Sequence, residues 1–408
     1  MKKTMMALLF TTGLVAPGMA ETIKIGVLAT FEGPFTVLGE DGLRGAMTAV
    51  DEVGGKVAGM DIEIVRGSSD ASPDSAVRAA RKLVEQDGVT VLVGPLSGDE
   101  GLAVKDYAKT QPGVTFINGS SAAQDTTLRD PAANFFRFGT DGAQWMAGLG
   151  TYAFTEKGYK SVAVVAEDYS FPYTQVFGFM AEFCKAGGKV PSKAWVPLGT
   201  KDYASVIAWL PDDVDAIFVA LGGADAVNFL GQYQQAGGTA PLVGGSITVD
   251  QTVLTSEGKL RDVLIGTPSA GPIADTNDTA PWMAFVDAYK TQEGAFPSPS
   301  LFAHAYYVNM KATLMGLEAV GGDTSDGGAK LQAALAGLSF DTPTGKVSLD
   351  ANRNAIADIF LTEVVVGPDG NLVNELKKVV PQVNQTLGID PAEFLALGVA
   401  NRDNPSCE

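Results

Sequence analysis

Short apolar runs alternate with amphipathic segments along the first third of the chain. Residues 22–29, TIKIGVLA, form a short apolar run that is typical of a buried strand. Residues 42–53 place Leu43, Ala46 and Met47 on one helical face. The same alternation predicts further strands at 60–70, 89–94 and 114–118, and helices at 73–88 and 102–109. Short links between such elements predict a parallel sheet covered by helices on both faces.

The alternation begins again near residue 135 and changes in the last third of the chain. It predicts helices at 142–157, 172–186, 202–209 and 224–236, and strands at 161–169, 188–197, 215–221 and 240–245. A strand at 263–269, helices at 279–292, 299–319 and 328–336, and antiparallel strands at 345–349, 356–366 and 372–380 follow. We therefore expect an α/β protein with two similar doubly wound lobes, between which the chain crosses back near its end.

Small and polar residues follow almost every predicted strand. The segments concerned are 94–101, 117–124, 166–173, 220–226 and 243–250. Ligands of open parallel sheets collect outside the carboxyl ends of the strands, where glycine lets the backbone approach and helix N-termini offer N–H groups. A single serine there is more often a helix cap than a ligand contact. Five such ends in one chain favour a shared binding cleft.

The first 20 residues have the features of an export signal. Lys2 and Lys3 precede an apolar run from Met5 to Val15, and small residues follow at Gly18 and Ala20. The run is shorter than the roughly 20 residues that a membrane-spanning helix needs. No cysteine follows the expected cleavage point, so a lipid anchor is not expected there. We expect a cleaved signal peptide and a periplasmic protein.

Composition excludes several classes of function. Without the two lysines of the signal, 27 of the 29 basic residues remain against 47 acidic ones, a net charge of about −20, which disfavours nucleic acid and anionic lipid as partners. A single histidine, His304, lies among apolar residues, and with two cysteines it leaves no basis for a zinc site. Cys184 and Cys407 either pair or remain one buried and one exposed thiol. No cofactor is expected.

Five stretches resemble type I periplasmic solute-binding proteins, in the branched-chain amino acid class that feeds ABC importers. These stretches are IKIGVLATFEGPFTVLGEDGLRGAMTAVDEVGG, GVTVLVGPLSGDEGLAV, FINGSSAAQDTTLRDPAANFFRF, VAVVAEDYSFPYTQVFGF and FDTPTGKVSLDANRNA. The resemblance implies two lobes, joined by three crossover segments, that close over a ligand. The expected lobes are 21–139 with about 272–355, and 140–271 with about 356–408. The implied partner is an ABC permease in the inner membrane, and we expect a monomer.

The resemblance also implies a ligand site. Ser97, with the adjacent backbone at Gly98, matches a position that binds a ligand carboxylate, and Ser120 and Ala122 match the loop that completes this anion site. Phe171 matches an aromatic residue that covers the ligand. Phe35 and Tyr173 are expected around the same cleft. Neutral hydroxyls and helix-end N–H groups hold a carboxylate without leaving a buried cation in the empty site.

Three departures from the family concern the amino group of the ligand. Ser246 stands where relatives that bind α-amino acids carry an acid, and Gly222 with Gly223 replaces an aromatic residue. Ala122 stands where a hydroxyl is usual, and Ser121 is a possible substitute. A buried ammonium without a carboxylate partner costs several kcal/mol. Asp225 is an alternative acid, although its place at a helix start favours a cap.

We therefore expect a carboxylate or amide ligand without an α-amino group, and an aromatic acid is one candidate. Binding of a branched-chain or other amino acid, and delivery of a ligand to a chemoreceptor, remain alternatives. Catalysis is not expected, because the chain lacks a G-x-S-x-G elbow, an H-E-x-x-H motif and a phosphate-binding loop. Residues 350–358, DANRNAIAD, lack the glycine and closing glutamate of a calcium loop, so we interpret them as a polar turn.

Overall fold

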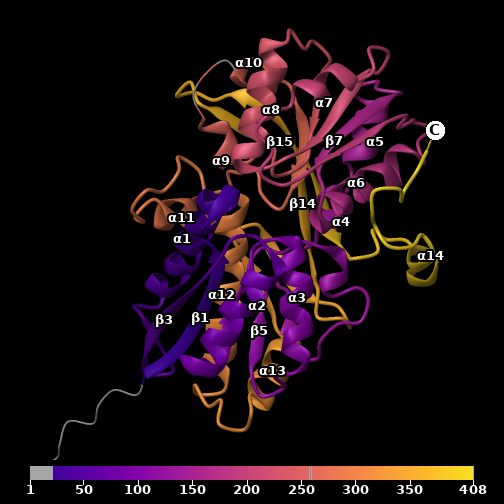
Figure 1. Ribbon diagram of the computed structural model, residues 1–408. Helices are drawn as coiled ribbons and strands as arrows, with labels where there is room; N and C mark the ends of the chain where they lie inside the picture. Colours follow the sequence, from indigo (N-terminus) through magenta and orange to yellow (C-terminus); the bar gives the residue numbers. More distant parts are fainter. Residues whose placement is uncertain (1–21, 257, 259, 408) are drawn as a thin grey trace, which may run out of the picture.

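Two β-sheets, each covered by helices, form the two lobes of the molecule (Figure 1). The computed structural model describes residues 22–256, 258 and 260–407. The predicted signal peptide, residues 1–20, lies outside the described residues. The prediction of an α/β protein with two doubly wound lobes is confirmed.

The sheet of the first lobe has six strands in the order β2-β3-β1-β4-β5-β6. The strands are β1 (Thr22–Thr30), β2 (Lys56–Val57), β3 (Met60–Ser69), β4 (Val91–Val93), β5 (Thr115–Ile117) and β6 (Phe135–Phe136). Strands β3, β4, β5 and β6 continue the sheet in parallel from β1, and only the short β2 is antiparallel. Their carboxyl ends therefore meet along one edge.

The sheet of the second lobe joins nine strands, of which the first five in the chain are parallel. These are β7 (Val162–Glu167), β8 (Lys193–Val196), β9 (Ala216–Ala220), β10 (Leu242–Gly244) and β11 (Pro268–Gly271). Four antiparallel strands are joined to it: β12 (Ser339–Thr342), β13 (Gly345–Leu349), β14 (Ala355–Val366) and β15 (Leu372–Val383). Of these, β12 and β13 pack on the first lobe, because Phe340 and Val347 lie in the same core cluster as Val27 of β1. The predicted antiparallel ending is present, and β14 links its strands to the parallel part.

Helices cover both sheets. In the first lobe they are α1 (Thr36–Glu52), α2 (Pro73–Arg81), α3 (Gly98–Lys109), α11 (Ala280–Tyr289), α12 (Leu301–Ala319) and α13 (Ala329–Ala336). In the second they are α4 (Gly142–Trp145), α5 (Leu149–Thr155), α6 (Ser170–Phe183), α7 (Ala204–Trp209), α8 (Gly223–Gln235), α9 (Gln251–Leu254) and α10 (Leu260–Leu264). The short helix α14 (Pro391–Ala396) follows β15. None of the described helices is long and apolar enough to cross a bilayer.

Two predicted elements were wrong in detail. The helix expected at 142–157 is broken into α4 and α5, because Gly148 adopts the left-handed conformation with φ 86°. The first residues of the strand expected at 263–269 belong to helix α10 instead. Gly266, at φ 84°, separates this helix from β11. The short apolar run Val263 to Ile265 fits a helix turn as well as a strand, so periodicity alone does not decide between them.

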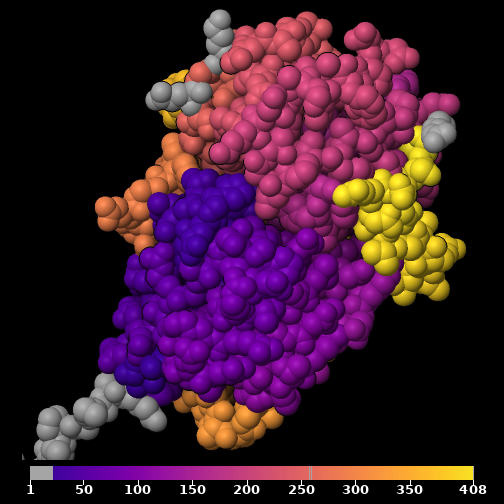
Figure 2. Space-filling view, in the orientation of Figure 1, coloured from indigo at the N-terminus to yellow at the C-terminus, as the bar shows by residue number. Residues whose placement is uncertain are grey.

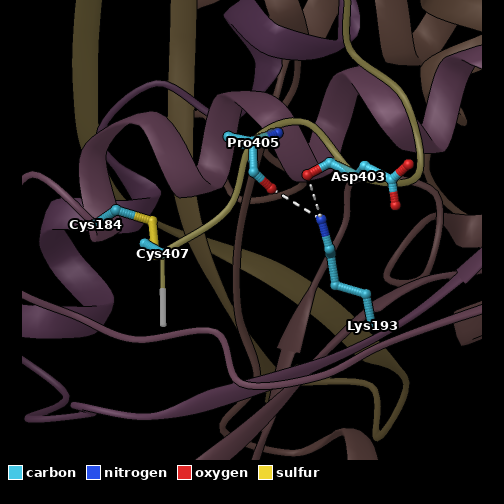
Figure 3. Close-up of a disulfide and its surroundings, with 5 residues drawn as sticks. All are labelled: Cys184, Lys193, Asp403, Pro405 and Cys407. Atoms are coloured by element: carbon cyan, nitrogen blue, oxygen red, sulfur yellow. Dashed lines mark hydrogen bonds between the residues drawn. A yellow bond between two sulfur atoms is a disulfide. The ribbon is translucent and has the colours of Figure 1, made fainter.

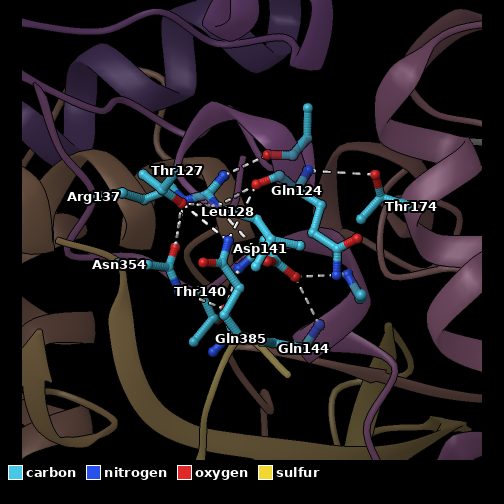
Figure 4. Close-up of polar contacts among 12 residues, drawn as sticks. Gln124, Thr127, Leu128, Arg137, Thr140, Asp141, Gln144, Thr174, Asn354 and Gln385 are labelled. Carbon is cyan, nitrogen blue, oxygen red and sulfur yellow. Dashed lines mark hydrogen bonds and ion pairs between the residues drawn. The ribbon is translucent and has the colours of Figure 1, made fainter. Parts of the chain in front are cut away.

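A buried polar network holds the chain where it crosses between the lobes (Figure 4). The Arg137 side chain is fully buried, and its Nε donates to Asn354 Oδ1 at 2.6 Å. Its Nη2 lies 3.7 Å from Asp141 Oδ2, which also accepts a hydrogen bond from Gln385 Nε2 at 3.0 Å. Arg137 and Asn354 lie on two different crossovers, so this network ties the crossovers together.

The C-terminal segment is fixed to the second lobe by a disulfide (Figure 3). Cys184, at the end of α6, is bonded to Cys407, with their Cα atoms 5.9 Å apart. The ammonium of Lys193 donates to the carbonyl oxygens of Asp403 at 3.2 Å and Pro405 at 2.8 Å. Of the two alternatives that the sequence left open for the cysteines, the structure has the pair.

Candidate functional site

A small pocket lies between the lobes, at the carboxyl ends of their strands. The first lobe lines it with Phe35, Leu38, Leu96, Ser97, Gly98, Ser120, Ala122 and Phe302. The second lobe lines it with Trp145, Tyr169, Phe171 and Ile247. Its free volume is about 20 Å³, room for little more than one water molecule, so a ligand needs the two lobes or the lining side chains to move apart.

Two serine hydroxyls form the polar side of the cavity. Ser97 precedes α3, and its hydroxyl donates to the carbonyl oxygen of Ala71 at 3.3 Å. The hydroxyl of Ser120 donates to the carbonyl oxygen of Leu96 at 3.2 Å. Each hydroxyl donates to a backbone carbonyl of its own lobe, and Ser97 also forms a capping box with Glu100 at the start of α3. A rotation about the C–O bond of either serine is enough to redirect its proton to an anion in the cavity.

Backbone N–H groups add further donors beside the serines. Helix α3 begins at Gly98, and the first N–H groups of a helix have no partner within it. Within the described residues, the N–H group of Ala122 donates no hydrogen bond. The N–H group of Ser97 is occupied, because it donates to Glu100 Oε2 at 2.8 Å. The available donors are therefore two hydroxyls and the N–H groups near Gly98 and Ala122, which together suit a carboxylate.

Aromatic rings form most of the opposite side. The rings of Trp145 and Phe171 meet edge to face, with centroids 5.5 Å apart. The ring centroid of Tyr169 lies 6.2 Å from that of Phe171 and 6.2 Å from that of Phe35. The indole N–H of Trp145 donates to Thr140 Oγ1 at 2.9 Å, so its one polar group is satisfied away from a ligand. These four neighbouring rings offer edge contacts and face contacts to a planar apolar ligand.

No residue that lines this cavity carries a charge. Two buried acids lie behind the lining, and burial raises the pKa of each. Glu100 accepts hydrogen bonds from the N–H of Ser97 and, at 3.3 Å, from Thr30 Oγ1. Glu167 accepts one from the N–H of Gly222 at 2.9 Å, and its pKa is well above the usual range. Both carboxyls are enclosed by protein and neither lines the cavity.

The structure brings six of the ten predicted ligand residues to the cavity. These are Phe35, Ser97, Gly98, Ser120, Ala122 and Phe171. Ser121 is buried on the other side of its loop, facing Gly101, where an added Cβ would lie 1.8 Å from the Ser121 hydroxyl oxygen. Adjacent residues of an extended loop point to opposite sides, so only one of the two serines reaches the cavity.

The other three predicted residues lie near the cavity without lining it. The hydroxyl of Tyr173 donates to Asp168, and its ring packs on Trp195 with centroids 4.8 Å apart. Gly222 lies behind Ile247, where an added Cβ would be 3.0 Å from Ile247 Cδ1. Ser246 accepts a hydrogen bond from Gln175 Nε2 at 2.6 Å and lines a neighbouring polar cavity with Asp250. Asp225, the alternative acid, accepts from the N–H of Gly199 at 2.7 Å.

Sequence reasoning missed six residues of the lining. These are Leu38, Leu96, Trp145, Tyr169, Ile247 and Phe302. Leu96, Tyr169 and Ile247 lie in strand-end segments that the sequence had already singled out, so the signal for them was present. Trp145 and Phe302 lie in helices, and no local pattern distinguishes them from core residues.

One small residue near the site, Gly119, serves packing. Gly119 faces the ring of Tyr306, because an added Cβ would lie 2.4 Å from Tyr306 Cζ. The sequence suggested that small residues from 119 onward allow a ligand to approach. For Gly119 the structure shows a close approach of a neighbouring helix instead.

The remaining candidates for chemistry have structural roles. His304 is buried, its Nε2 lies 3.0 Å from Thr344 Oγ1, and burial lowers its pKa to about 3. In the 350–358 turn, Asp350 Oδ1 accepts from the N–H groups of Asn352 at 2.8 Å and Asn354 at 3.0 Å. This is the expected polar turn. No group of three or more His, Cys, Asp or Glu in the described chain is placed to hold a metal ion.

Comparisons with known proteins concern the chain as a whole. A family model described as a periplasmic binding protein matches residues 22–371. The chain is 27% identical over 384 residues to the Leu/Ile/Val-binding protein homolog 6 of Brucella melitensis biotype 1, with 92% of this chain and 96% of the relative covered.

Two solved structures are similar over nearly their full length. An ABC transporter substrate-binding protein from Sphaerobacter thermophilus is 28% identical with a TM-score of 0.80, covering 90% of this chain and 99% of its own. A solute-binding protein of an ABC transporter from Rhodopseudomonas palustris BisB5, in complex with 3,4-dihydroxy benzoic acid, is 26% identical with a TM-score of 0.82. The similarity covers 89% of this chain and 98% of that protein.

Proposed function

Because the chain belongs to the periplasmic binding protein family, as an ABC transporter solute-binding protein, we propose that it captures a small aromatic monocarboxylate between its lobes. Membership of the family confirms the resemblance that the sequence indicated, and the prediction that the protein is not an enzyme. The family implies a permease as partner. We propose that the ligand is delivered from the periplasm to this permease.

The observation that carries the proposal is the distribution of polar groups in the cavity. The two serine hydroxyls and the free N–H groups belong to the first lobe, and they suit one carboxylate. The other lining residues are apolar or aromatic, and none is acidic. The ammonium of an amino acid would have no carboxylate partner in this cavity, at a cost of several kcal/mol.

The relatives point to two ligand classes, and the lining favours one of them. The Rhodopseudomonas palustris structure holds an aromatic acid, whereas the Brucella relative is described as a Leu/Ile/Val-binding protein homolog. Four rings around a neutral cavity support the aromatic acid for this chain. The positions of Glu167 and Asp225 support it too, because each carboxyl is held by a backbone N–H outside the cavity.

Calorimetric titration of ligand-stripped protein tests this proposal. The probes are benzoate, 3,4-dihydroxybenzoate, benzamide and leucine. We expect benzoate or its dihydroxy form to bind more tightly than benzamide, which has the same ring without the charge. Binding of leucine more tightly than benzoate would refute the proposed ligand class. Equal binding of benzoate and benzamide would refute the anion site.

A further inference from the structure

The last part of the chain runs across the boundary between the two lobes (Figure 2). We call residues 384–407 the C-terminal strap. It lies beyond residue 371, where the match to the family model ends. On the second lobe it is held by the disulfide to Cys184 and by a hydrogen bond from the N–H of Val190 to the carbonyl of Cys407 at 2.7 Å. Arg402 adds an ion pair with Asp168.

The strap also contacts the first lobe. The amide of Gln385 donates to the carbonyl of Gln124 at 3.1 Å and to Thr127 Oγ1 at 3.0 Å. Farther along the strap, the carbonyl of Gly398 accepts a hydrogen bond from Arg129 Nη2 at 2.8 Å. Between these points, Phe394 is fully buried in a small apolar cluster with Leu128 of the first lobe and Phe177 of α6.

The first-lobe residues that the strap contacts follow Ser120 closely in the sequence. Residues 120–129, which we call the anchor loop, begin at Ser120 and Ala122 in the cavity and end at Arg129 on the strap. Buried Arg137 holds the loop together, because its guanidinium donates to the carbonyl of Ala123 at 2.7 Å and to Thr127 Oγ1 at 2.6 Å (Figure 4). Leu128 and the cavity wall therefore belong to one hydrogen-bonded loop.

We propose that the C-terminal strap positions the anchor loop against the second lobe and thereby favours the closed, ligand-holding form. The strap is covalently fixed to α6, so separation of the lobes pulls Leu128 and Arg129 away from it. Closure restores the Phe394 cluster and the hydrogen bond to Gly398. The proposal rests on opening and closing of the lobes around a ligand, as in the proposed function, and not on the chemical identity of that ligand.

Hydrogen exchange of the ligand-free protein tests the strap without any ligand. The reporters are the amides of Thr126, Thr127 and Leu128, which are hydrogen-bonded within the loop. We expect Phe394→Ala, and the double variant Cys184→Ser with Cys407→Ser, to speed their exchange roughly tenfold. Leu395→Ala is the matched control, because Leu395 is the next residue of α14 and 43% exposed. This control should leave the exchange unchanged.

A second readout separates positioning from general destabilisation. Exchange in the first-lobe strand β1 should remain as slow in the variants as in the wild type, and bound benzoate should dissociate faster. Equal acceleration in β1 and the anchor loop, or unchanged exchange in the loop, would overturn the proposal. Failure of benzoate to bind the wild type would refute the proposed ligand class and leave the exchange result to decide the role of the strap.

Discussion

The two walls of the ligand cavity differ in chemistry. The first lobe supplies both serine hydroxyls and the free N–H groups of Gly98 and Ala122. The same lobe adds the apolar side chains of Phe35, Leu38, Leu96 and Phe302. Among the residues that the structure describes, the second lobe supplies three aromatic residues and Ile247, and no hydroxyl of a serine. One lobe is therefore suited to hold a charge, and the other to cover an apolar body.

This difference suggests separate contributions to binding. On the proposed function, the groups that would bind the anion lie at strand and helix ends of a single lobe, so we expect their arrangement not to depend on closure. The aromatic wall gains its contacts only on closure, when water leaves the cavity. The first wall should set the preference for a carboxylate, whereas the second should set the preference for ligand shape and the rate of release.

Removing the central ring of the aromatic wall should have the largest effect. Phe171 is 5% exposed and contacts both Trp145 and Tyr169. We expect Phe171→Ala to weaken binding of benzoate by about 3 kcal/mol, because a buried aromatic anchor is lost. Calorimetry measures this loss. Tyr173→Ala is the control on the same helix, and an equal loss in both variants would contradict the distinction between the two residues.

A substitution that prevents full closure of the two walls should have the next largest effect on ligand binding. A Cβ at Gly98 would lie 2.6 Å from Ser170 Oγ and 2.9 Å from Phe171 Cβ. Gly98→Ala should therefore hinder closure and weaken binding by about 2 kcal/mol, a typical cost of overpacking. Small-angle X-ray scattering with saturating ligand should show a more open form. Gly231→Ala is the control, because its added Cβ meets no atom within 4 Å.

Removing one hydroxyl from the first wall should have a smaller and more selective effect. Ser97→Ala should weaken binding of benzoate by about 1.5 kcal/mol, the usual loss of a hydrogen bond to a charged group. Binding of benzamide should change less, because its amide carries no charge. Ser121→Ala removes a buried hydroxyl outside the cavity and should leave both affinities unchanged. Equal effects of the two serine variants would remove Ser97 from the site.

Acidification should have the smallest effect. It should change the stability contributed by one buried group in each lobe, in opposite directions and by about 1 kcal/mol over one pH unit. In the second lobe, burial raises the pKa of Asp250 to about 7, so its contribution to stability grows as the pH falls from about 7 toward 4. In the first lobe, burial lowers the pKa of His304 to about 3, so its contribution is lost as the pH falls below about 6.5. The two contributions change in opposite directions with pH, because burial favours the protonated form of Asp250 and the deprotonated form of His304. In each case this is the uncharged form.

Denaturant unfolding at pH 7 and pH 5 checks these signs. Relative to the wild type, His304→Gln should be more stable at pH 5 than at pH 7, since the variant has no histidine to protonate. Asp250→Asn should behave in the opposite way, because it cannot take up the stabilising proton. A difference from wild type that does not change with pH would contradict the assignment for that residue.

The fold followed from the sequence because its signals are local. Apolar runs such as 22–29 and 162–167 alternate with amphipathic helices over short distances, and this period identifies each element separately. The errors lie where the local signal is ambiguous. Gly148 breaks a predicted helix, and the apolar run at 263–265 is short enough to suit either type of element.

The lining of the candidate cavity was predicted only in part, because its two walls come from distant segments. Ser97, Ser120 and Phe171 stand at strand ends or helix starts, where the topology of an α/β sheet directs attention. Trp145 and Phe302 lie in helices and reach the cavity only through the packing of the two lobes. Their positions in the sequence give no sign of this.

By itself the sequence determined the fold class, the order of most elements and several of the strand ends that line the candidate cavity. These depend on residue spacing and backbone preference, which act over a few residues. Only the tertiary structure decided that Ser120 and not Ser121 faces the cavity, and that Cys184 pairs with Cys407 across 223 residues. Such choices depend on which distant surfaces pack together, and their energies arise only when the chain is folded.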